Sequence, residues 1–418
     1  MFLHFDQGKL LVESDVKFAE GRSMEALPLD EKINDLKVVL KVEDFQQLLD
    51  ALIRRDYQVV GPTLKEGAVV YDSLTRVSQL PAGWTDEQQA GHYSLKKRSD
   101  QAYFGYGVGP QSWKKFLFPP RITLWKQKSP GEAPEPAELP QDAPRYAFLG
   151  VRACELKAIT LQDQVFLTGP FIDPIYQARR EKVFIVAVNC GQAGANCFCA
   201  SVGSGPQVTQ GYDLALTEVT AAPEAYFLVE VGSQAGQTLL NEVTHRPATG
   251  KEVAEARQVV ERAASEMSKS LATADLKDFL YTNYENPYWA EVAGRCLACA
   301  NCTLVCPTCF CTSPEDVSDL TGQVTEHRRR WDSCFSLDFS YLHGGSVRPS
   351  RQSRYRQWLT HKLGTWQDQF GEIGCVGCGR CITWCPVGID LTTEIRALRQ
   401  AAATLTAGTE TNPKSDER

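Results

Sequence analysis

Long apolar runs are missing from this sequence of 418 residues. No run approaches the roughly 18 consecutive apolar residues that a membrane-spanning helix needs. The first residues, Met1 to Glu13, include His4, Asp6 and Gln7 in place of the basic stretch and apolar core of a secretory signal. These absences argue against a membrane bundle, and we expect a cytoplasmic protein with no membrane partner.

An excess of positive charge is also missing. Lysine and arginine together number 44 against 51 aspartates and glutamates, which gives a net charge of -7. Nucleic acids and anionic membranes attract basic surfaces, so an acidic chain binds either of them poorly. We therefore expect no nucleic-acid partner.

Several signatures of bond-making chemistry are absent as well. Histidine is scarce, with six in the chain, and none forms a His-x3-His or Glu-x2-His ligand pair. No Walker phosphate loop and no Gly-x-Ser-x-Gly nucleophile motif occurs. The glycine-rich stretch from Gly105 to Gly109 lacks the spacing of a dinucleotide loop and precedes Pro110, so we expect a turn there. The sequence thus shows no evident place for bond chemistry of its own.

What the chain does contain is the composition of an ordinary globular protein, with 43% apolar and 23% charged residues. Its length predicts about two or three domains. We expect the α+β class, beginning with a mixed α/β region over residues 1–126. Apolar spacing predicts a helix there through Phe45, Leu48, Leu49 and Leu52, followed by strands at 59–60, 68–71 and 122–125.

Proline content and apolar periodicity divide the rest of the chain. Five prolines between Lys126 and Arg145 predict an exposed loop or linker over residues 127–145. A second α/β domain is expected over residues 146–250, with buried strands at 146–151, 183–188, 214–219 and 226–231. We then expect a connecting helix over 251–284, a helical domain over 285–400 with an apolar stripe from Tyr355 to Phe370, and a frayed polar tail over 401–418.

Cysteine carries the strongest signal. Of 15 cysteines, most lie between Cys296 and Cys385 at short fixed spacings, which in a reducing compartment favour metal binding over disulfides. The pattern Cys-x2-Cys-x2-Cys-x3-Cys-Pro of two-cluster ferredoxins occurs twice. In that pattern the fourth cysteine of each repeat binds the other cluster. We therefore assign one [4Fe-4S] cluster to Cys296, Cys299, Cys302 and Cys385, and a second to Cys375, Cys378, Cys381 and Cys306.

Two alternatives compete with this assignment. Cys-x2-Cys pairs also build zinc sites, although zinc sites seldom add a third cysteine at the same spacing and a Cys-Pro end. The clusters could also be purely structural, but two cubanes in one small domain favour electron transfer. The long stretch between Cys306 and Cys375 exceeds the spacing of a compact ferredoxin, so we expect an insertion between the repeats.

Four further cysteines predict a third cluster. Cys154 and Cys190 each follow a predicted buried strand, and Cys197 and Cys199 lie soon after Cys190. If the two strands are neighbours in one sheet, their loops meet at the edge where α/β domains bind ligands. Four thiolates would then be available for a third [4Fe-4S] cluster. Buried structural cysteines and a zinc site are the alternatives.

The last three cysteines, Cys309, Cys311 and Cys334, have no clear assignment. They could exchange with Cys306 as a ligand, reach a further cofactor, or pack as small apolar residues near the clusters, which is the favoured interpretation. The nearby basic run from His327 to Arg330 predicts a solvated face. It could also offset cluster charge or dock a partner.

The cysteine motifs resemble the iron-sulfur beta subunit of soluble NADP-reducing [NiFe] hydrogenases, also called sulfhydrogenases. The resemblance covers about Val42 to Leu398, with no visible departure in the cysteine set, and the electron-transfer subunit of anaerobic sulfite reductase is related. The motifs that carry it are Gly-Val-Arg-Ala-Cys ending at Cys154, Cys-Phe-Cys ending at Cys199, Cys-Pro-Thr-Cys-Phe-Cys ending at Cys311, Trp-Asp-Ser-Cys ending at Cys334, and the two ferredoxin-type repeats.

The resemblance implies a subunit of a larger complex. In such a complex a flavin-bearing subunit exchanges hydride with NADP(H), the beta subunit relays single electrons, and the [NiFe] hydrogenase small and large subunits complete the path. The expected function is therefore electron transfer, without catalysis by this chain alone. The alternatives are the corresponding electron-transfer subunit of a sulfite reductase and, from a different class, a scaffold or nucleic-acid protein with structural clusters.

Overall fold

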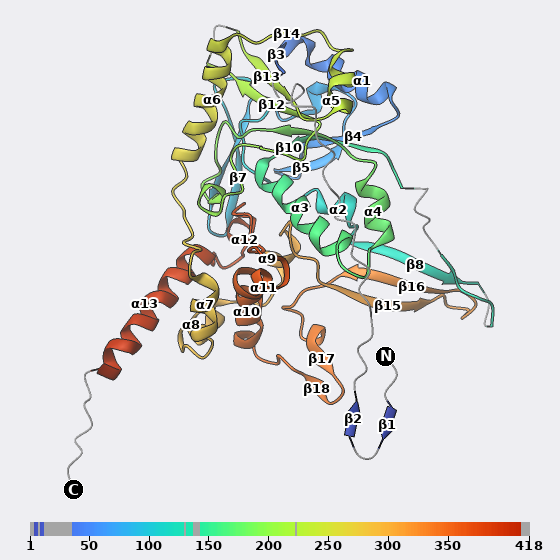
Figure 1. The fold of residues 1–418 in the computed structure, drawn as a ribbon, viewed down its shortest axis with the longest axis vertical. Coiled ribbons are helices and arrows are strands. Elements are labelled where there is room, and N and C mark those ends of the chain that lie inside the picture. Colours follow the sequence, from blue (N-terminus) through green and yellow to red (C-terminus); the bar gives the residue numbers. More distant parts are fainter. Residues whose placement is uncertain are drawn as a thin grey trace.

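The computed structural model describes residues 36–128, 131–136, 143–221 and 224–410, together with strands β1 (His4–Asp6) and β2 (Lys9–Leu11) near the N-terminus. Figure 1 shows a large sheet with its helices in the upper half of the molecule, and a group of short helices below it. A long hairpin extends to one side. The expected α+β class with a helical C-terminal part is confirmed.

The large sheet has the strand order β14-β3-β13-β12-β11-β10-β4-β5. Its neighbours β4, β10, β11 and β12 are parallel, and the remaining pairs are antiparallel. The strands are β3 (Lys37–Lys41), β4 (Gln58–Lys65), β5 (Ala68–Ser73), β10 (Tyr146–Val151), β11 (Phe184–Val188), β12 (Leu214–Val219), β13 (Tyr226–Val231) and β14 (Arg246–Pro247). The predicted buried strands are therefore present and adjacent.

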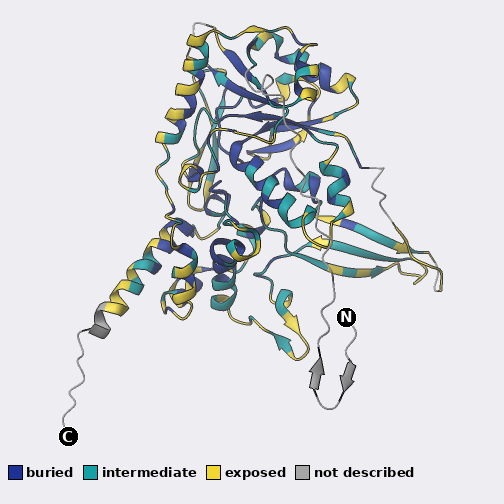
Figure 2. Cartoon of the chain, in the orientation of Figure 1, coloured by how far each residue is buried: buried dark blue, intermediate teal, exposed yellow. Residues whose placement is uncertain are grey.

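Both faces of the sheet are buried, as expected for parallel strands covered by crossover helices (Figure 2). Successive residues alternate between the two cores: Leu149 and Val186 belong to one, and Phe148 and Ile185 to the other. Helices α1 (Phe45–Arg54) and α5 (Gln234–Leu240) contribute to the first core. Helices α2 (Lys114–Leu117), α3 (Ala153–Leu167) and α4 (Pro174–Arg180) contribute to the second.

This sheet joins two regions that the sequence pattern treats as separate. Strand β4 pairs with β10, and β3 pairs with β13, so residues 36–126 and 146–250 share one hydrophobic core. The hydrophobic pattern is local, whereas the pairing joins residues far apart in the chain. The expected boundary at residue 126 therefore does not separate two independent units.

A second sheet crosses the expected boundaries in the same way. It has the order β15-β16-β8-β9, from β15 (Thr312–Ser318), β16 (Thr325–Trp331), β8 (Arg121–Gln127) and β9 (Glu135–Pro136). The described part of the proline-rich segment 127–145 therefore contributes a short edge strand. The insertion between the ferredoxin-type repeats, which we expected within a helical domain, contains a β-hairpin that β8 extends into a sheet.

The expected connecting helix is two helices. Helix α6 (Gly250–Ser265) ends well before α7 (Leu276–Thr282) begins. The link between them is fixed to the rest of the molecule: Leu271 is buried, its N–H donates to the Ser201 hydroxyl, and Lys269 pairs with Asp390 at 2.5 Å. These tertiary contacts outweigh the helical pattern of the sequence.

The C-terminal helices pack around a separate aromatic core that contains Trp289, Tyr355 and Trp358. The predicted apolar stripe forms helix α10, one π-helical turn (His361–Thr365) and α11. Helix α13 continues past residue 401, where a tail was expected, because three consecutive alanines from Ala401 favour helix. Residues 411–418 lie outside the described part. The helices are α8 (Tyr288–Arg295), α9 (Asn301–Leu304), α10 (Arg351–Thr360), α11 (Trp366–Phe370), α12 (Arg380–Thr383) and α13 (Leu391–Glu410).

Candidate functional site

The first ferredoxin-type quartet forms where the chain leaves α8. Cys296 caps that helix, and Ala298 and Ala300 adopt left-handed backbone angles that turn the loop around the site. Cys385 arrives from the loop after α12. Burial and the thiols of Cys296, Cys385 and Cys299 raise the pKa of Cys302 well above its ordinary value. All four cysteines line one cavity, as the crossed pairing predicts.

The walls of this cavity suit a sulfur-rich group. Tyr355 and Trp358 line it, and both side chains are buried. Within the described part of the chain, the Tyr355 hydroxyl and the Trp358 indole N–H meet no hydrogen-bond partner. Buried donors normally have an acceptor, and inorganic sulfide or a thiolate supplies one.

The structure also brings the four cysteines of the second quartet together. The thiols of Cys375, Cys378 and Cys381 interact with one another and with Cys306, which comes from the first repeat. Burial raises the pKa of Cys375 to about 12. Cys381 and Cys306 also interact with Cys302 of the first quartet. The two quartets are therefore neighbours.

The third set of cysteines comes together at the carboxyl ends of two parallel strands. Gly150, with φ of 94°, lies near the end of β10, where the chain turns into α3, whose first turn holds Cys154. Cys190 follows β11. The Cys199 thiol interacts with Cys197 and Cys190, and the Cys154 thiol interacts with Cys199 and Cys190. The structure thus brings together all four cysteines predicted for a third cluster.

Two buried arginines border this third quartet. Arg380, between the ligand candidates Cys378 and Cys381, pairs with Glu155 at 2.5 Å, and both side chains are almost fully buried. The guanidinium also interacts with the thiols of Cys378 and Cys154. Arg152 lies beside Cys190. Buried cations require compensating negative charge, and thiolates bound to iron provide it.

Backbone carbonyls hold both arginines in place. Arg152 donates to the Phe104 carbonyl at 2.7 Å and to the Tyr106 carbonyl at 3.2 Å, and Arg380 donates to the Gly109 carbonyl at 2.8 Å. Backbone carbonyl oxygens in and next to the glycine-rich stretch 105–109 therefore bind the guanidinium groups of Arg152 and Arg380. Gly109 has no room for a side chain, because a Cβ would lie 1.9 Å from the Val69 carbonyl oxygen.

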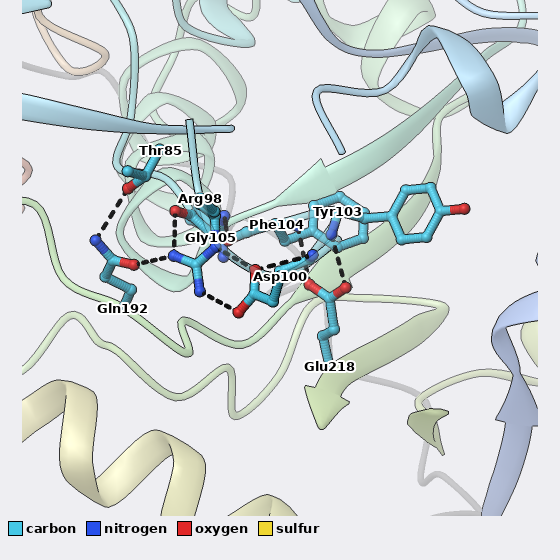
Figure 3. Close-up of polar contacts among 10 residues, drawn as sticks. Thr85, Arg98, Asp100, Tyr103, Phe104, Gly105, Gln192 and Glu218 are labelled. Atoms are coloured by element: carbon cyan, nitrogen blue, oxygen red, sulfur yellow. Dashed lines mark hydrogen bonds and ion pairs between the residues drawn. The ribbon is translucent and has the colours of Figure 1, made fainter. Parts of the chain in front are cut away.

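A polar network fixes this stretch to the loop that follows Cys190 (Figure 3). Gln192 donates to Thr85, in β6 (Trp84–Gln89), at 3.0 Å and accepts from Arg98, just after β7 (His92–Lys97). The carboxylate of Glu218 accepts the N–H groups of Tyr103 and Phe104 at 2.7 and 2.9 Å. The loop with Cys190 is thus held in position by long-range hydrogen bonds.

The third quartet docks directly on the second. The Phe198 N–H donates to the Gly377 carbonyl at 2.8 Å, and the Ser204 hydroxyl donates to the Val376 carbonyl at 2.7 Å. The thiols of Cys154, Cys197 and Cys199 each interact with Cys378. The three quartets therefore follow one another in the order first, second, third.

Burial and mutual repulsion keep these thiols protonated in the absence of a cation. Burial raises the pKa of Cys197 to about 12, with the neighbouring thiols of Cys190 and Cys378 contributing to the rise. Coordinated iron removes thiol protons outright. Among the described residues, no three Cys, His, Asp or Glu side chains converge closely enough for one metal ion. A cubane distributes its ligands over four irons and needs a wider arrangement.

The remaining cysteines form hydrogen-bonded pairs. Cys309 donates to Cys306, which lowers the pKa of Cys306 and raises that of Cys309. Cys334 donates to Cys311 and lowers the pKa of Cys311 to about 7. Two buried lysines, Lys114 and Lys362, interact with this group. The sequence predicted small apolar packing for these thiols, and the two cations beside them do not fit that interpretation.

The basic run 327–330 does not supply these cations. In β16, Arg329 pairs with Asp173, Arg330 with Glu315, and Arg328 with Glu326. Sequence reasoning overlooked the charges that do face the cysteines, which are Arg152, Arg380, Lys114 and Lys362. The arginines lie within or next to cysteine motifs and could have been noticed. The two lysines carry no local signal.

Comparisons with known proteins agree with this arrangement. Residues 295–389 match the model of a 4Fe-4S dicluster domain. The chain is 34% identical over 283 residues to sulfhydrogenase 2 subunit beta of Pyrococcus furiosus, an alignment that covers 66% of this chain and 79% of that protein. No solved structure matches the chain. Among the described helices, none is both long and apolar enough to cross a membrane. The chain belongs to the sulfhydrogenase beta-subunit family, and it is an iron-sulfur protein that binds [4Fe-4S] clusters and transfers electrons.

Proposed function

We propose that this chain relays single electrons through three [4Fe-4S] clusters in series. The first is held by Cys296, Cys299, Cys302 and Cys385, the second by Cys306, Cys375, Cys378 and Cys381, and the third by Cys154, Cys190, Cys197 and Cys199. When bound, each cluster takes up and releases one electron at a time. The observation that carries the proposal is the packing of Cys378, in the second quartet, against the third: it shares one buried cluster with Cys154 and Cys199, and the Cys197 sulfur lies 3.9 Å from its carbonyl oxygen.

The protein supplies position and charge to this relay. Arg380 and Arg152 provide buried positive charge beside the second and third quartets. The docking of the loop 196–199 on Gly377 and Gly379 fixes the third quartet next to the second. The buried aromatic side chains Tyr355 and Trp358 cover one side of the first quartet, whereas Cys299 leaves its other side open to a partner.

We further propose that the partners are an NADP(H)-oxidising flavoprotein and a [NiFe] hydrogenase module, each a separate subunit of the complex. The similarity to a sulfhydrogenase beta subunit supports this pairing. The first quartet supplies a suitable contact surface, because Cys299 is exposed and the exposed apolar side chains of Leu297 and Val387 line the same cavity. Interface cores are depleted in charge, as this patch is.

The cluster count is tested by iron and sulfide analysis of anaerobically prepared protein, with electron paramagnetic resonance of reduced samples. Each cluster contributes about four irons. Cys154→Ser should remove one cluster and leave the two ferredoxin-type signals. Cys299→Ser is the matched control, which should lose a ferredoxin-type signal and keep the third. An unchanged iron content in Cys154→Ser would contradict the third cluster.

The partner assignment has its own test. A complex purified from its native cells through a tag on this chain should contain nickel and flavin. Siroheme in place of nickel would contradict the hydrogenase assignment and favour the sulfite reductase alternative.

A further inference from the structure

Three cysteines remain outside the three quartets, and the fold gathers them at one place. Cys311 lies just before β15 and Cys334 just after β16. The first ladder pair of this hairpin is Thr312 with Trp331, and beyond it the Asp332 N–H donates to the Cys311 carbonyl at 2.8 Å. The ladder therefore sets Cys311 opposite Asp332, and the Cys334 thiol, two residues further on, lies within hydrogen-bonding reach of the Cys311 thiol. Cys309 lies next to them and interacts with Cys311.

Two ammonium groups are buried against these thiols. Lys114 and Lys362 are 4% and 3% exposed. Lys114 donates to the carbonyls of Cys306 and Cys309, each at 3.0 Å, and its ammonium lies over the Trp331 ring at 3.9 Å. Lys362 donates to the Cys306 sulfur at 3.3 Å and to the Thr308 hydroxyl at 3.0 Å. Neither lysine pairs with a carboxylate in the described part of the chain.

Two buried cations without carboxylates need negative charge nearby. Neutral thiols that merely fill space do not provide it. The thiolates of the second quartet account for Lys362, which contacts Cys306 and interacts with Cys375. Lys114 lies beside Cys309 and Cys311 as well as Cys306 of the second quartet. Metal-bound thiolates of Cys309 and Cys311 would add to the negative charge that Cys306 supplies beside this ammonium group.

We propose that Cys309, Cys311 and Cys334 hold a fourth iron-sulfur centre beside the second ferredoxin-type quartet. The inference rests on the proposed function, since it adds a centre to the same relay. An iron-sulfur centre fits better than a single ion such as zinc, because no described trio of ligands converges on one ion, and the same holds for the ferredoxin-type quartets. Cys309 contacts Cys306 of the second quartet, and Cys334 interacts with Cys302 of the first quartet. The proposed centre therefore lies next to both ferredoxin-type quartets.

The first test measures iron and acid-labile sulfide in the full chain, prepared without air. The double variant Cys311→Ser/Cys334→Ser should lose about three or four irons per chain. Ser318→Ala is the matched control, since Ser318 lies at the far end of the same hairpin and is exposed, and this variant should keep the full complement. Unchanged iron in the double variant would overturn the proposal.

A second measurement does not depend on the folding of a variant. Cys311 is partly exposed and its pKa is lowered to about 7, so as a free thiol it should react readily with iodoacetamide. In the intact iron-loaded protein, mass spectrometry should find Cys311 protected, and removal of iron by a chelator should raise its labelling at least about tenfold.

Rapid labelling of Cys311 in the iron-loaded protein, with the quartet cysteines protected, would refute the fourth centre and leave the relay intact. Stoichiometric zinc at the site would also refute it. Labelling of all the cysteines in a protein without iron would instead refute the proposed function.

Discussion

Tyr355 and Trp358 show how single residues prepare the first quartet for a cluster. Their polar hydrogens are buried, and the described part of the chain offers them no acceptor. Leaving a buried donor unpaired costs about 1–3 kcal/mol, so an acceptor in the adjoining cavity is favoured. Hydrogen bonds to cluster sulfurs raise the reduction potential, because they stabilise the more negative, reduced state.

Tyr355→Phe should therefore lower the potential of one cluster. A hydrogen bond of about 1 kcal/mol corresponds to about 40 mV for a one-electron couple. The substitution conserves volume, so the fold and iron content should not change. A redox titration followed by electron paramagnetic resonance measures the shift. Tyr281→Phe is the control, since the Tyr281 hydroxyl is exposed and bonds Asp368; equal potentials in both variants would contradict the role given to Tyr355.

At the scale of elements, the decisive contact is between two loops. Gly377 and Gly379 lie between the cysteines of the second repeat and have φ angles of 61° and 74°. A Cβ on Gly377 would lie 2.6 Å from the Cys199 nitrogen, and one on Gly379 would lie 2.4 Å from the Asn196 carbonyl oxygen. These glycines therefore serve two purposes: they turn the ligand loop and they let the third quartet approach it.

Comparing Gly377→Ala with Gly371→Ala should separate the cost of the left-handed backbone angle from the cost of the clash between the two loops. Gly371 has a φ of 78° and open space where a Cβ would lie, so both variants carry the same backbone cost of about 1–2 kcal/mol. The clash with Cys199 should cost a further 1–3 kcal/mol or so in Gly377→Ala. Thermal unfolding of the iron-loaded proteins tests this. Equal losses would show that the loops do not depend on close contact.

The whole molecule is organised around the series of quartets. The second quartet lies between the other two: Cys381 interacts electrostatically with Cys302 of the first, and Cys378 and Gly377 pack against the loop 196–199 of the third. The C-terminal helices hold the first two quartets, and the large sheet holds the third at the carboxyl ends of β10 and β11 (Figure 1). In the proposed relay, electrons that pass between the first and third sites therefore cross the middle one.

This order predicts how the reduced clusters interact magnetically. Spins on neighbouring reduced clusters broaden each other's resonance. Loss of the middle cluster in Cys375→Ser should leave narrow, separate signals, whereas Cys299→Ser removes an end cluster and should keep broadened signals from the second and third. Electron paramagnetic resonance of fully reduced samples measures the widths of these signals. Persistent broadening in Cys375→Ser would mean that the quartets do not lie in this order.

Much of the site was predictable because its chemistry is local. The spacing of Cys296, Cys299 and Cys302, and its repetition at Cys375, Cys378 and Cys381, indicate two clusters without any knowledge of the fold. The strands before Cys154 and Cys190 were likewise visible as short apolar runs. Both features depend on residues a few positions apart, where hydrophobic period and ligand spacing are informative.

The predictions from the sequence that failed concern contacts between residues far apart in the chain. Strand β8 joins the hairpin of β15 and β16 only through hydrogen bonds to residues some two hundred positions away, and the connecting helix breaks where Lys269 meets Asp390. Lys114 and Lys362 have ordinary sequence neighbours and acquire meaning only beside Cys306 and Cys309. Such contacts leave no periodic trace in the chain.

The amino-acid sequence by itself determined that this protein binds iron-sulfur clusters, since thiol spacing is a property of a few consecutive residues. Only the tertiary structure decided how the sites are ordered, which cations face them, and that Cys309, Cys311 and Cys334 meet. The physical reason is that charge compensation and close approach act through space, between residues that the chain brings together only when the sheet and the C-terminal helices have packed.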